Sequence, residues 1–181
     1  MFDRSGIENG ALVIPEKIAG FPVSTISGDA FSCERRDTYK DITSVTLPDS
    51  MKEIGRFAFN NCTSLREVNL PDGITSIGAW SFAGTALESV TLPKSLEVLS
   101  IGAFRNCEQL KTLVIDCPEL YAVSEHTVWS LGDPFANCTS LETIDFVSLP
   151  EIGQGWFANC VSLESVTLPE NLEVIGSGAF N

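Results

Sequence analysis

The chain has 181 residues, 44% of them hydrophobic, and a formal net charge of -13. This length suffices for one well-buried domain, and no apolar run approaches the roughly 20 residues of a membrane-spanning helix. The charge argues against nucleic-acid binding, because such binding rests on neutralising phosphates with basic groups. All 11 Lys and Arg lie in residues 1–111, so the last part of the chain is purely acidic. That surface serves either for solubility or for attracting a basic partner.

The first part of the chain is irregular. Residues 1–5 lack a basic leader followed by an apolar stretch, so they do not form an intact secretory signal. The first apolar unit covers about residues 12–31 and has no regular strand pattern. We interpret residues 1–181 as a single repeat domain of about seven units, with the last unit cut short at Phe180 and Asn181. This interpretation makes the chain a segment of a longer protein.

Six strand-like segments follow the first unit, each close to the pattern L-x-x-V-x-L. They cover residues 42–47, 65–70, 87–92, 110–115, 141–146 and 163–168. Their fourth and sixth residues are apolar, and side chains alternate between the two faces of a strand. We therefore expect the third and fifth residues to point outward.

A closing segment follows each strand. Most strands are followed by proline, which lacks a backbone donor and ends strand pairing. The pattern I-G-x-x-A-F comes next, and for it we expect short strands, turns or 3₁₀ pieces and no long helices. Two coils are enlarged, near 34–41 and 118–133. Insertions in repeat proteins often form loops on a binding face.

Phenylalanine recurs at one position of this pattern, with spacings of 28, 23, 22, 31, 22 and 23 residues. The members of this column are Phe31, Phe59, Phe82, Phe104, Phe135, Phe157 and Phe180. A period of 20 to 30 residues with leucines at fixed places indicates a solenoid, in which each unit buries its apolar face against its neighbours. We therefore expect the column to be buried.

Five of the six cysteines share another repeat position, which predicts small buried residues in a stack and free thiols. Cys117 lies outside this column, and we expect it to be the exception to their low reactivity. Without a C-x-x-C pair, and with His126 as the only histidine, a zinc site is not expected. The run of Ser124, Glu125 and His126 does not by itself make a catalytic triad. We expect no enzyme activity, no catalytic residues and no cofactor.

Together, the L-x-x-V-x-L-P, I-G-x-x-A-F and N-C elements resemble the BspA-like leucine-rich repeats of surface proteins. The resemblance covers about residues 12–181; the chain departs from it at Ser100 in a Gly position, at Asp116 and Val147 where Pro is usual, and in the two insertions. It implies a β-rich, right-handed solenoid with a parallel concave sheet and short turn, 3₁₀ or strand segments on the convex side. It also implies a secreted or cell-surface location, with signal and anchor outside this segment, and a role in adhesion or protein binding.

The candidate partner-binding residues lie on the concave strands and in the second insertion. They are Arg66, Glu67, Asn69, Glu88, Lys111, Tyr121, His126, Trp129, Glu142, Asp145 and Glu164. Hydroxylic and β-branched residues also suit any exposed parallel sheet, so a purely structural interpretation of the strand positions stays open.

Three functions fit these residues. The first is an interaction module that binds a host or neighbouring-cell surface protein through the concave sheet and the insertion loops. The second is a glycan-binding module in which Trp129 and Tyr121 stack on sugars. The third is a structural spacer between other domains. The sequence favours the first, on fold analogy, and predicts no membrane insertion by this segment.

Overall fold

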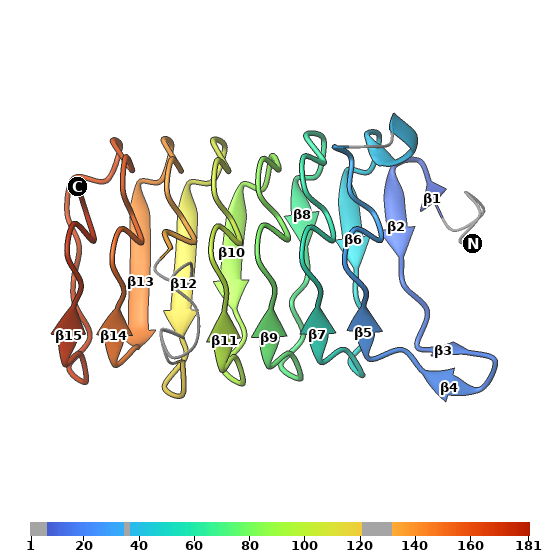
Figure 1. Cartoon of the computed structure of the whole chain (residues 1–181), viewed down its shortest axis with the longest axis horizontal. Helices are drawn as coiled ribbons and strands as arrows, with labels where there is room; N and C mark the ends of the chain where they lie inside the picture. Colours follow the sequence, from blue (N-terminus) through green and yellow to red (C-terminus); the bar gives the residue numbers. More distant parts are fainter. Residues whose placement is uncertain (1–6, 35–36, 121–131) are drawn as a thin grey trace.

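A computed structural model describes residues 7–34, 37–120 and 132–181 of the chain. Figure 1 shows the coils stacked side by side in one row, with β2 and β15 toward opposite ends. The described residues contain no α-helix, and therefore no helix that could span a membrane. The right-handed sense and the curvature that the resemblance implies stay predictions.

The strands fall into two groups on opposite sides of the coils, and a single short 3₁₀ helix, η2, is assigned in the described residues. The elements are β1 (Ile7–Glu8), β2 (Ala11–Val13), β3 (Lys17–Ile18), β4 (Phe21–Pro22), β5 (Thr25–Ile26), η2 (Asp37–Tyr39), β6 (Ser44–Thr46), β7 (Glu53–Ile54), β8 (Glu67–Val68), β9 (Ser76–Ile77), β10 (Ser89–Leu92), β11 (Val98–Leu99), β12 (Thr112–Asp116), β13 (Thr143–Ser148), β14 (Glu151–Ile152) and β15 (Val174–Ile175).

The L-x-x-V-x-L segments form two parallel sheets in register. One has the order β1-β2-β6-β8, with β1 antiparallel, and the other has the order β10-β12-β13. A backbone hydrogen bond from Glu88 N to Arg66 O, 3.3 Å long, links the coils between them. We call the outward side of β6, β8, β10, β12 and β13 the strand face.

The predicted strands are shorter at their starts than expected, because regular pairing begins at the third residue of each segment. The sixth expected strand, at 163–168, was wrong. In that segment only the bridge between Asp145 and Thr167 is assigned. Its inward Leu168 is 43% exposed at the end of the row, whereas the matching Leu92 is buried, so little burial holds this segment in a strand.

Strand length follows the proline pattern. The segments before Pro48, Pro71 and Pro93 form strands of three, two and four residues. Where Asp116 and Val147 replace proline, β12 and β13 reach five and six residues. Asp116 and Val147, unlike proline, carry a backbone N–H that can take part in pairing, so the strands continue further.

The closing segments form the other side of the row. Their short strands pair in the parallel order β11-β9-β7-β5, with β14-β15 further along the chain. The expectation of short strands and turns without long helices is therefore confirmed for the described residues. The first unit adds a small antiparallel hairpin, β3-β4, which projects from the row in Figure 1.

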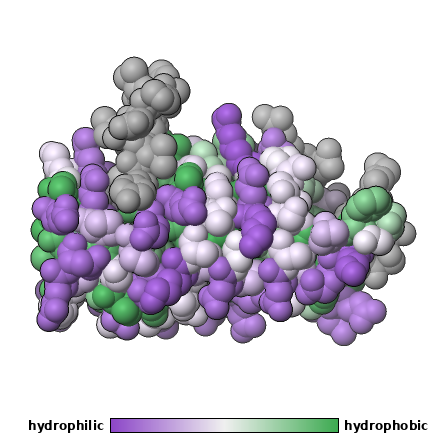
Figure 2. Space-filling view, turned by 90° about the horizontal axis from the view of Figure 1, so that it is seen from below, coloured by the Kyte–Doolittle hydropathy of each residue, from purple (hydrophilic) through white to green (hydrophobic). Residues whose placement is uncertain are grey.

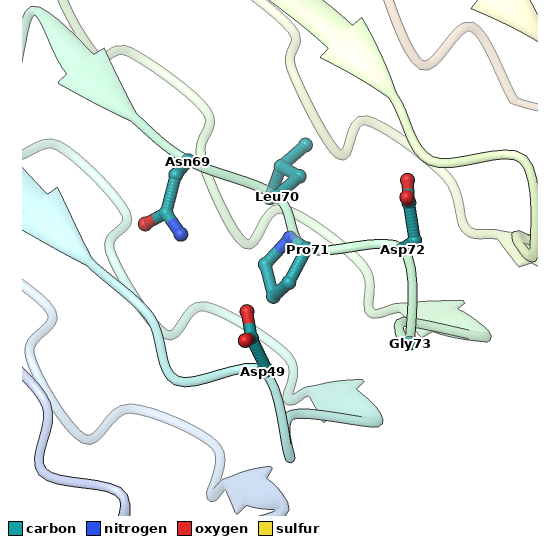
Figure 3. A pocket seen from close by; sticks show the side chains of 6 residues that line it. All are labelled: Asp49, Asn69, Leu70, Pro71, Asp72 and Gly73. Atoms are coloured by element: carbon teal, nitrogen blue, oxygen red, sulfur yellow. The ribbon is translucent and has the colours of Figure 1, made fainter.

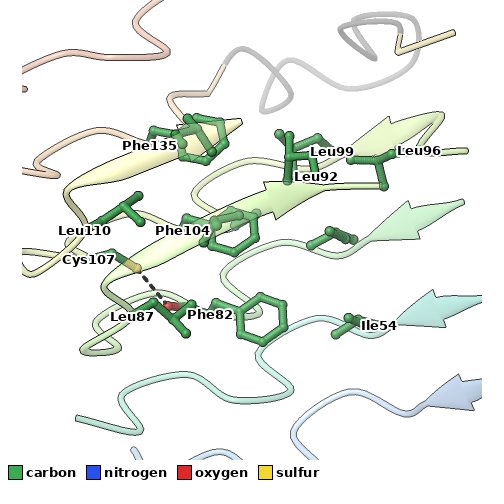
Figure 4. Packing of buried hydrophobic residues seen from close by; sticks show 14 of the residues in the cluster. Ile54, Phe82, Leu87, Leu92, Leu96, Leu99, Phe104, Cys107, Leu110 and Phe135 are labelled. Carbon is green, nitrogen blue, oxygen red and sulfur yellow. Dashed lines mark hydrogen bonds between the residues drawn. The ribbon is translucent and has the colours of Figure 1, made fainter. Parts of the chain in front are cut away.

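The phenylalanine column runs through the core, as predicted. Neighbouring rings stack with centroids 5.2–5.5 Å apart and planes within 14° of parallel. Figure 4 shows Phe82, Phe104 and Phe135 in this stack, beside Leu87, Leu110 and Cys107. Backbone bonds fix the spacing, as from Phe59 N to Ser81 O at 2.7 Å. All rings are buried except Phe180, which is 41% exposed at the last coil.

The column of Asn residues before the cysteines has a conformational cause. Asn61, Asn106, Asn137 and Asn159 all have φ between 57° and 62°. L residues rarely adopt this left-handed conformation, and Asn tolerates it better than most. Gly84, with φ 68°, occupies the same position in the remaining coil. In the N-C motif, the asparagine therefore suits a left-handed turn, and the cysteine that follows it places a thiol in the core.

Candidate binding surface

The outward positions of the long strands form an exposed polar sheet. In β10, the side chains of Val90 and Leu92 are buried, whereas Ser89 and Thr91 are exposed. The outward residues stand in register along the row, as Ser89 with Thr112 and Thr112 with Thr143. The predicted alternation of inward apolar and outward polar residues is confirmed here.

The second residue of each segment adds a row of charges beside the strand face. Backbone bonds place Arg66, Glu88, Lys111 and Glu142 next to one another in successive coils, so positive and negative side chains alternate. The guanidinium of Arg66 pairs with Glu88, with Nη1 2.9 Å from Oε1, and both side chains are more than half exposed. Such an exposed pair contributes little to stability. The register also places Lys111 beside Glu142, although Glu142 belongs to the part of the sequence without basic residues.

Two further candidates, Glu67 and Asp145, lie on the strand face, and a third, Glu164, lies beyond it in the last coil. Glu67 is exposed and stands in register with Ser44. Asp145 is exposed and stands between Val114 and Thr167. Glu164 is exposed in the last coil. The acidic side chains at the C-terminal end of the row are thus on the surface, as a binding role requires.

Asn69 has a structural task. Its Oδ1 accepts a hydrogen bond from Leu47 N at 2.6 Å, and its Nδ2 donates to Leu47 O at 3.0 Å. The side-chain amide thereby continues the pairing between two coils beyond the end of β8. It also borders an open hollow of about 470 Å³ with Asp49 and Asp72. Figure 3 shows that these two carboxylates come from separate turns and do not converge.

The candidates of the second insertion, Tyr121, His126 and Trp129, lie outside the described residues. The proposed contact between this loop and the strand face is therefore untested, and it stays a prediction. Within residues 7–34, 37–120 and 132–181, no group of three or more His, Cys, Asp or Glu side chains could hold a metal ion.

The cysteines are free and buried. The four later thiols of the column donate to phenylalanine carbonyl groups one coil earlier; the bond from Cys107 Sγ to Phe82 O, 3.3 Å long, is the dashed line in Figure 4. Cys33 Sγ instead donates to Phe31 O of its own coil at 3.6 Å. The expectation that Cys117 is an exception was wrong, because its side chain is fully buried and its Sγ donates to Pro93 O at 3.4 Å. Burial, with a smaller effect of the Asp116 carboxylate, raises the pKa of Cys117 to about 12. Burial also raises the pKa of Cys160 to about 11.

Hydrophobic surface is exposed at the end of the row that carries the C-terminus, as Figure 2 shows. Leu168, Val174, Ile175 and Phe180 are each between 41% and 51% exposed there. The rest of the side seen in Figure 2 is mainly hydrophilic.

Sequence reasoning did not single out Phe57 and Trp80, which occupy the variable position two residues before the phenylalanine column. Both are partly exposed and have positive φ. The available signal was a contrast within the repeats, because three other coils have glycine at this position, namely Gly102, Gly155 and Gly178.

Solved structures of bacterial proteins share this fold. A leucine-rich cell surface protein from Faecalibacterium prausnitzii is 29% identical with a TM-score of 0.57, over 77% of this chain and 32% of that protein. A leucine-rich repeat protein from T. pallidum is 25% identical with a TM-score of 0.54, over 93% and 73%. The pneumococcal vaccine antigen PcpA, 20% identical with a TM-score of 0.57 over 98% and 43%, shows the fold alone. The chain spans only about a third of the first of these proteins.

The sequence also matches a family profile, described as BspA type Leucine rich repeat region, in six copies over residues 24–130 and 124–181. No curated protein gives a significant match. The profile covers most of the chain, and the repeating strands and phenylalanine column form the solenoid that leucine-rich repeats build. The chain therefore belongs to the BspA-type leucine-rich repeat family.

Proposed function

We propose that the chain is a non-enzymatic protein-interaction or adhesion module of a secreted or cell-surface protein. Its partner would be a protein of a host or neighbouring cell, bound on the strand face. The observation that carries the proposal is the register of exposed polar residues across β10, β12 and β13. A broad sheet with varied outward side chains suits a protein surface better than a small substrate, which usually requires an enclosed pocket.

The location rests on the family and on the F. prausnitzii relative, which is described as a cell surface protein. The acidic residues Glu142, Asp145 and Glu164 would steer a basic partner toward the C-terminal half of the face, and salt would weaken this effect by screening. Tyr121, His126 and Trp129 are proposed to add contacts from the second insertion. Aromatic side chains commonly provide the few residues that dominate binding energy.

A protein array of secreted and cell-surface ectodomains, probed with the fluorescent chain, tests this function. We expect at least one ectodomain to bind, with affinity that falls between 50 and 300 mM salt. The double substitution Glu142→Gln/Asp145→Asn and, separately, Trp129→Ala should weaken that binding.

The matched control is Glu53→Gln/Glu97→Gln, which removes two exposed carboxylates from the side of the short strands. It changes the net charge by the same amount as the strand-face pair. Equal weakening by both double variants would place the effect in net charge alone. A ligand insensitive to salt, to the strand-face pair and to Trp129→Ala would place the binding site on another face.

A further inference from the structure

Phe57 and Trp80 stand at the same repeat position in adjacent coils, on the segments that follow β7 and β9. Their φ angles are 57° and 58°. A left-handed backbone is unfavourable for a bulky L residue and costs glycine almost nothing. Gly102, Gly155 and Gly178 take this conformation in other coils. Two large aromatic residues are thus kept where glycine would be easier to accommodate, and such local strain is typical of functional sites.

The two rings are held in place by their neighbours. Trp80 lies against the backbone of Gly102, since a Cβ added to that glycine would be 3.0 Å from Cδ2 of the indole. The guanidinium of Arg105 is 5.8 Å from the centre of the Trp80 ring, and Arg105 forms an ion pair with Asp133. The guanidinium of Arg56 lies 4.6 Å from the centre of Phe57. These contacts arrange the aromatic surface in advance of any ligand.

A hollow of about 310 Å³ opens beside the rings. Phe57 and Trp80 line it together with the amides of Asn60, Asn61 and Asn106. Asn60 is only 5% exposed, and its Oδ1 accepts from Asn61 Nδ2 at 3.3 Å. Glu34 also lines the hollow, so polar groups make up at least as much of its wall as apolar ones. Such a lining matches a ligand that combines an apolar face with hydrogen-bonding groups.

The asparagine column is interrupted at this hollow. Further along the row, Asn159 Nδ2 donates to Asn137 Oδ1 at 2.9 Å, and Asn137 Nδ2 donates to Asn106 Oδ1 at 2.8 Å. The next coil has Gly84 in place of asparagine, and a Cβ there would collide with Asn61 Oδ1. The column therefore lacks one amide, between Asn61 and Asn106.

The direction of the hydrogen bonds defines what would fill the gap. Asn159 and Asn137 each donate to the amide of the preceding coil, whereas Asn61 donates to Asn60 of its own coil. The missing group would donate to Asn61 Oδ1 and accept from Asn106 Nδ2. Within the described part of the chain the Asn106 amide takes part in a hydrogen bond through Oδ1, as acceptor from Asn137. With coils about 5 Å apart, Asn61 and Asn106 lie about 10 Å apart along the row. A secondary amide, whose N–H and C=O point in opposite directions, has the required geometry.

We propose that this hollow binds an N-acetylated amino sugar. The acetamido group takes the place of the missing asparagine amide, and the sugar ring lies against the indole of Trp80. Aromatic rings suit such a ligand, because they offer a rigid apolar face to the C–H groups of the sugar. The net charge of -13 disfavours an anionic glycan. This site lies apart from the strand face and is independent of the proposed protein partner.

N,N′-diacetylchitobiose is the probe, and cellobiose is the matched control, because it has the same ring linkage without acetamido groups. We expect chitobiose to bind with a Kd of about 1 mM, measured by calorimetry or ligand-observed NMR, and cellobiose to bind at least tenfold more weakly. Equal binding of the two sugars, or no binding of chitobiose at 10 mM, would overturn the proposal.

Three substitutions locate the site. Trp80→Gly should weaken chitobiose binding at least tenfold while the circular dichroism spectrum stays unchanged, because glycine fits the backbone there. Gly84→Asn should also weaken it at least tenfold, because its side chain takes the space between Asn61 and Asn106 and displaces the Asn61 amide from the added Cβ. Trp129→Ala should leave it unchanged. Binding that survives both Trp80→Gly and Gly84→Asn would refute the site, and loss only in Trp129→Ala would move it to the second insertion.

Discussion

The ring of Tyr39 meets the ring of Phe31 edge-on, with centroids 5.4 Å apart and an angle of 74° between the planes. Tyr39 belongs to η2 in the first insertion, so this insertion covers the first ring of the phenylalanine column. Parallel stacking stops there, because an edge-on ring offers no face for another. The first enlargement of a coil thus has a structural task, which its length alone did not reveal.

Truncating a ring in the middle of the column should be costly. We expect Phe82→Ala or Phe104→Ala to lower the free energy of unfolding by roughly 3–5 kcal/mol, because each removes a fully buried ring and leaves a cavity. Urea denaturation measures this. Phe21→Ala is the control, since Phe21 is 76% exposed and its truncation should have little effect. A loss below about 1 kcal/mol at Phe82 would contradict the stacking described above.

Removing the hydroxyl of Ser81 should stabilise the protein. Ser81 is fully buried, and its Oγ has no hydrogen-bond partner in the described structure. Ala58 and Ala103 occupy the equivalent position in the neighbouring coils. An unsatisfied buried polar group costs about 1–3 kcal/mol, so Ser81→Ala should raise the free energy of unfolding by roughly 1 kcal/mol. Ser89→Ala, at an exposed position of β10, should change it little; a destabilised Ser81→Ala variant would indicate that the hydroxyl has a partner.

Thiol reagents should label the native protein slowly at all six cysteines. Each thiol is buried, and reactivity requires an accessible thiolate. Labelling at pH 8 followed by mass spectrometry should give less than one label per native chain and six after unfolding in urea. Two or more disulfides in the purified protein would contradict the arrangement of parallel side chains in the column.

Stability should fall as the pH rises above about 9. The pKa of Cys160 is raised from 9.0 to about 11 and that of Cys117 to about 12 by burial. The unfolded chain therefore loses these protons first, so the stabilisation is complete below pH 9 and decreases between pH 9 and pH 11–12. Each such thiol contributes a slope of up to about 1.4 kcal/mol per pH unit.

Urea midpoints at pH 8, 9 and 10 under reducing conditions measure this slope. Cys117→Ala serves as the comparison, because the change in its midpoint between pH 8 and 10 should be smaller than in the parent chain. The same change in both proteins would show that Cys117 titrates normally when folded.

Hydrogen exchange should report a gradient along the row. Ile175 of β15 is 51% exposed, whereas Ile54 and Ile77 at the same position of inner coils are fully buried. Because each coil of a solenoid is stabilised by its neighbours, amides of residues 172–181 should exchange fastest and those around Phe82 and Phe104 slowest. Uniform exchange along the chain would indicate a single cooperative unit.

The sequence specified the repeating parts of the fold well. The spacing of the phenylalanines and the alternation of apolar and polar residues in segments such as 87–92 can be read directly from the sequence. Each predicts which side chains are buried. The missing sixth strand was less accessible, because the residues of 163–168 match the pattern of the other strands and only the reduced burial at the end of the row sets them apart. The role of Asn69 was also hidden. Asparagine at an outward strand position is usually free to bind a partner, and only the structure shows that its amide is hydrogen-bonded to the backbone of Leu47. Phe57 and Trp80 were missed because only the backbone angle shows why a large residue at that position is unusual.

Proline sets the extent of the strand face one coil at a time. Coils that carry it stop after two to four paired residues, whereas Asp116 and Val147 let β12 and β13 continue to five and six. One exchange at this position alters the outline of the surface and leaves the buried columns unchanged. A protein built this way can acquire a new contact area without redesigning its core, so the shape of the surface can diversify faster than the fold that supports it.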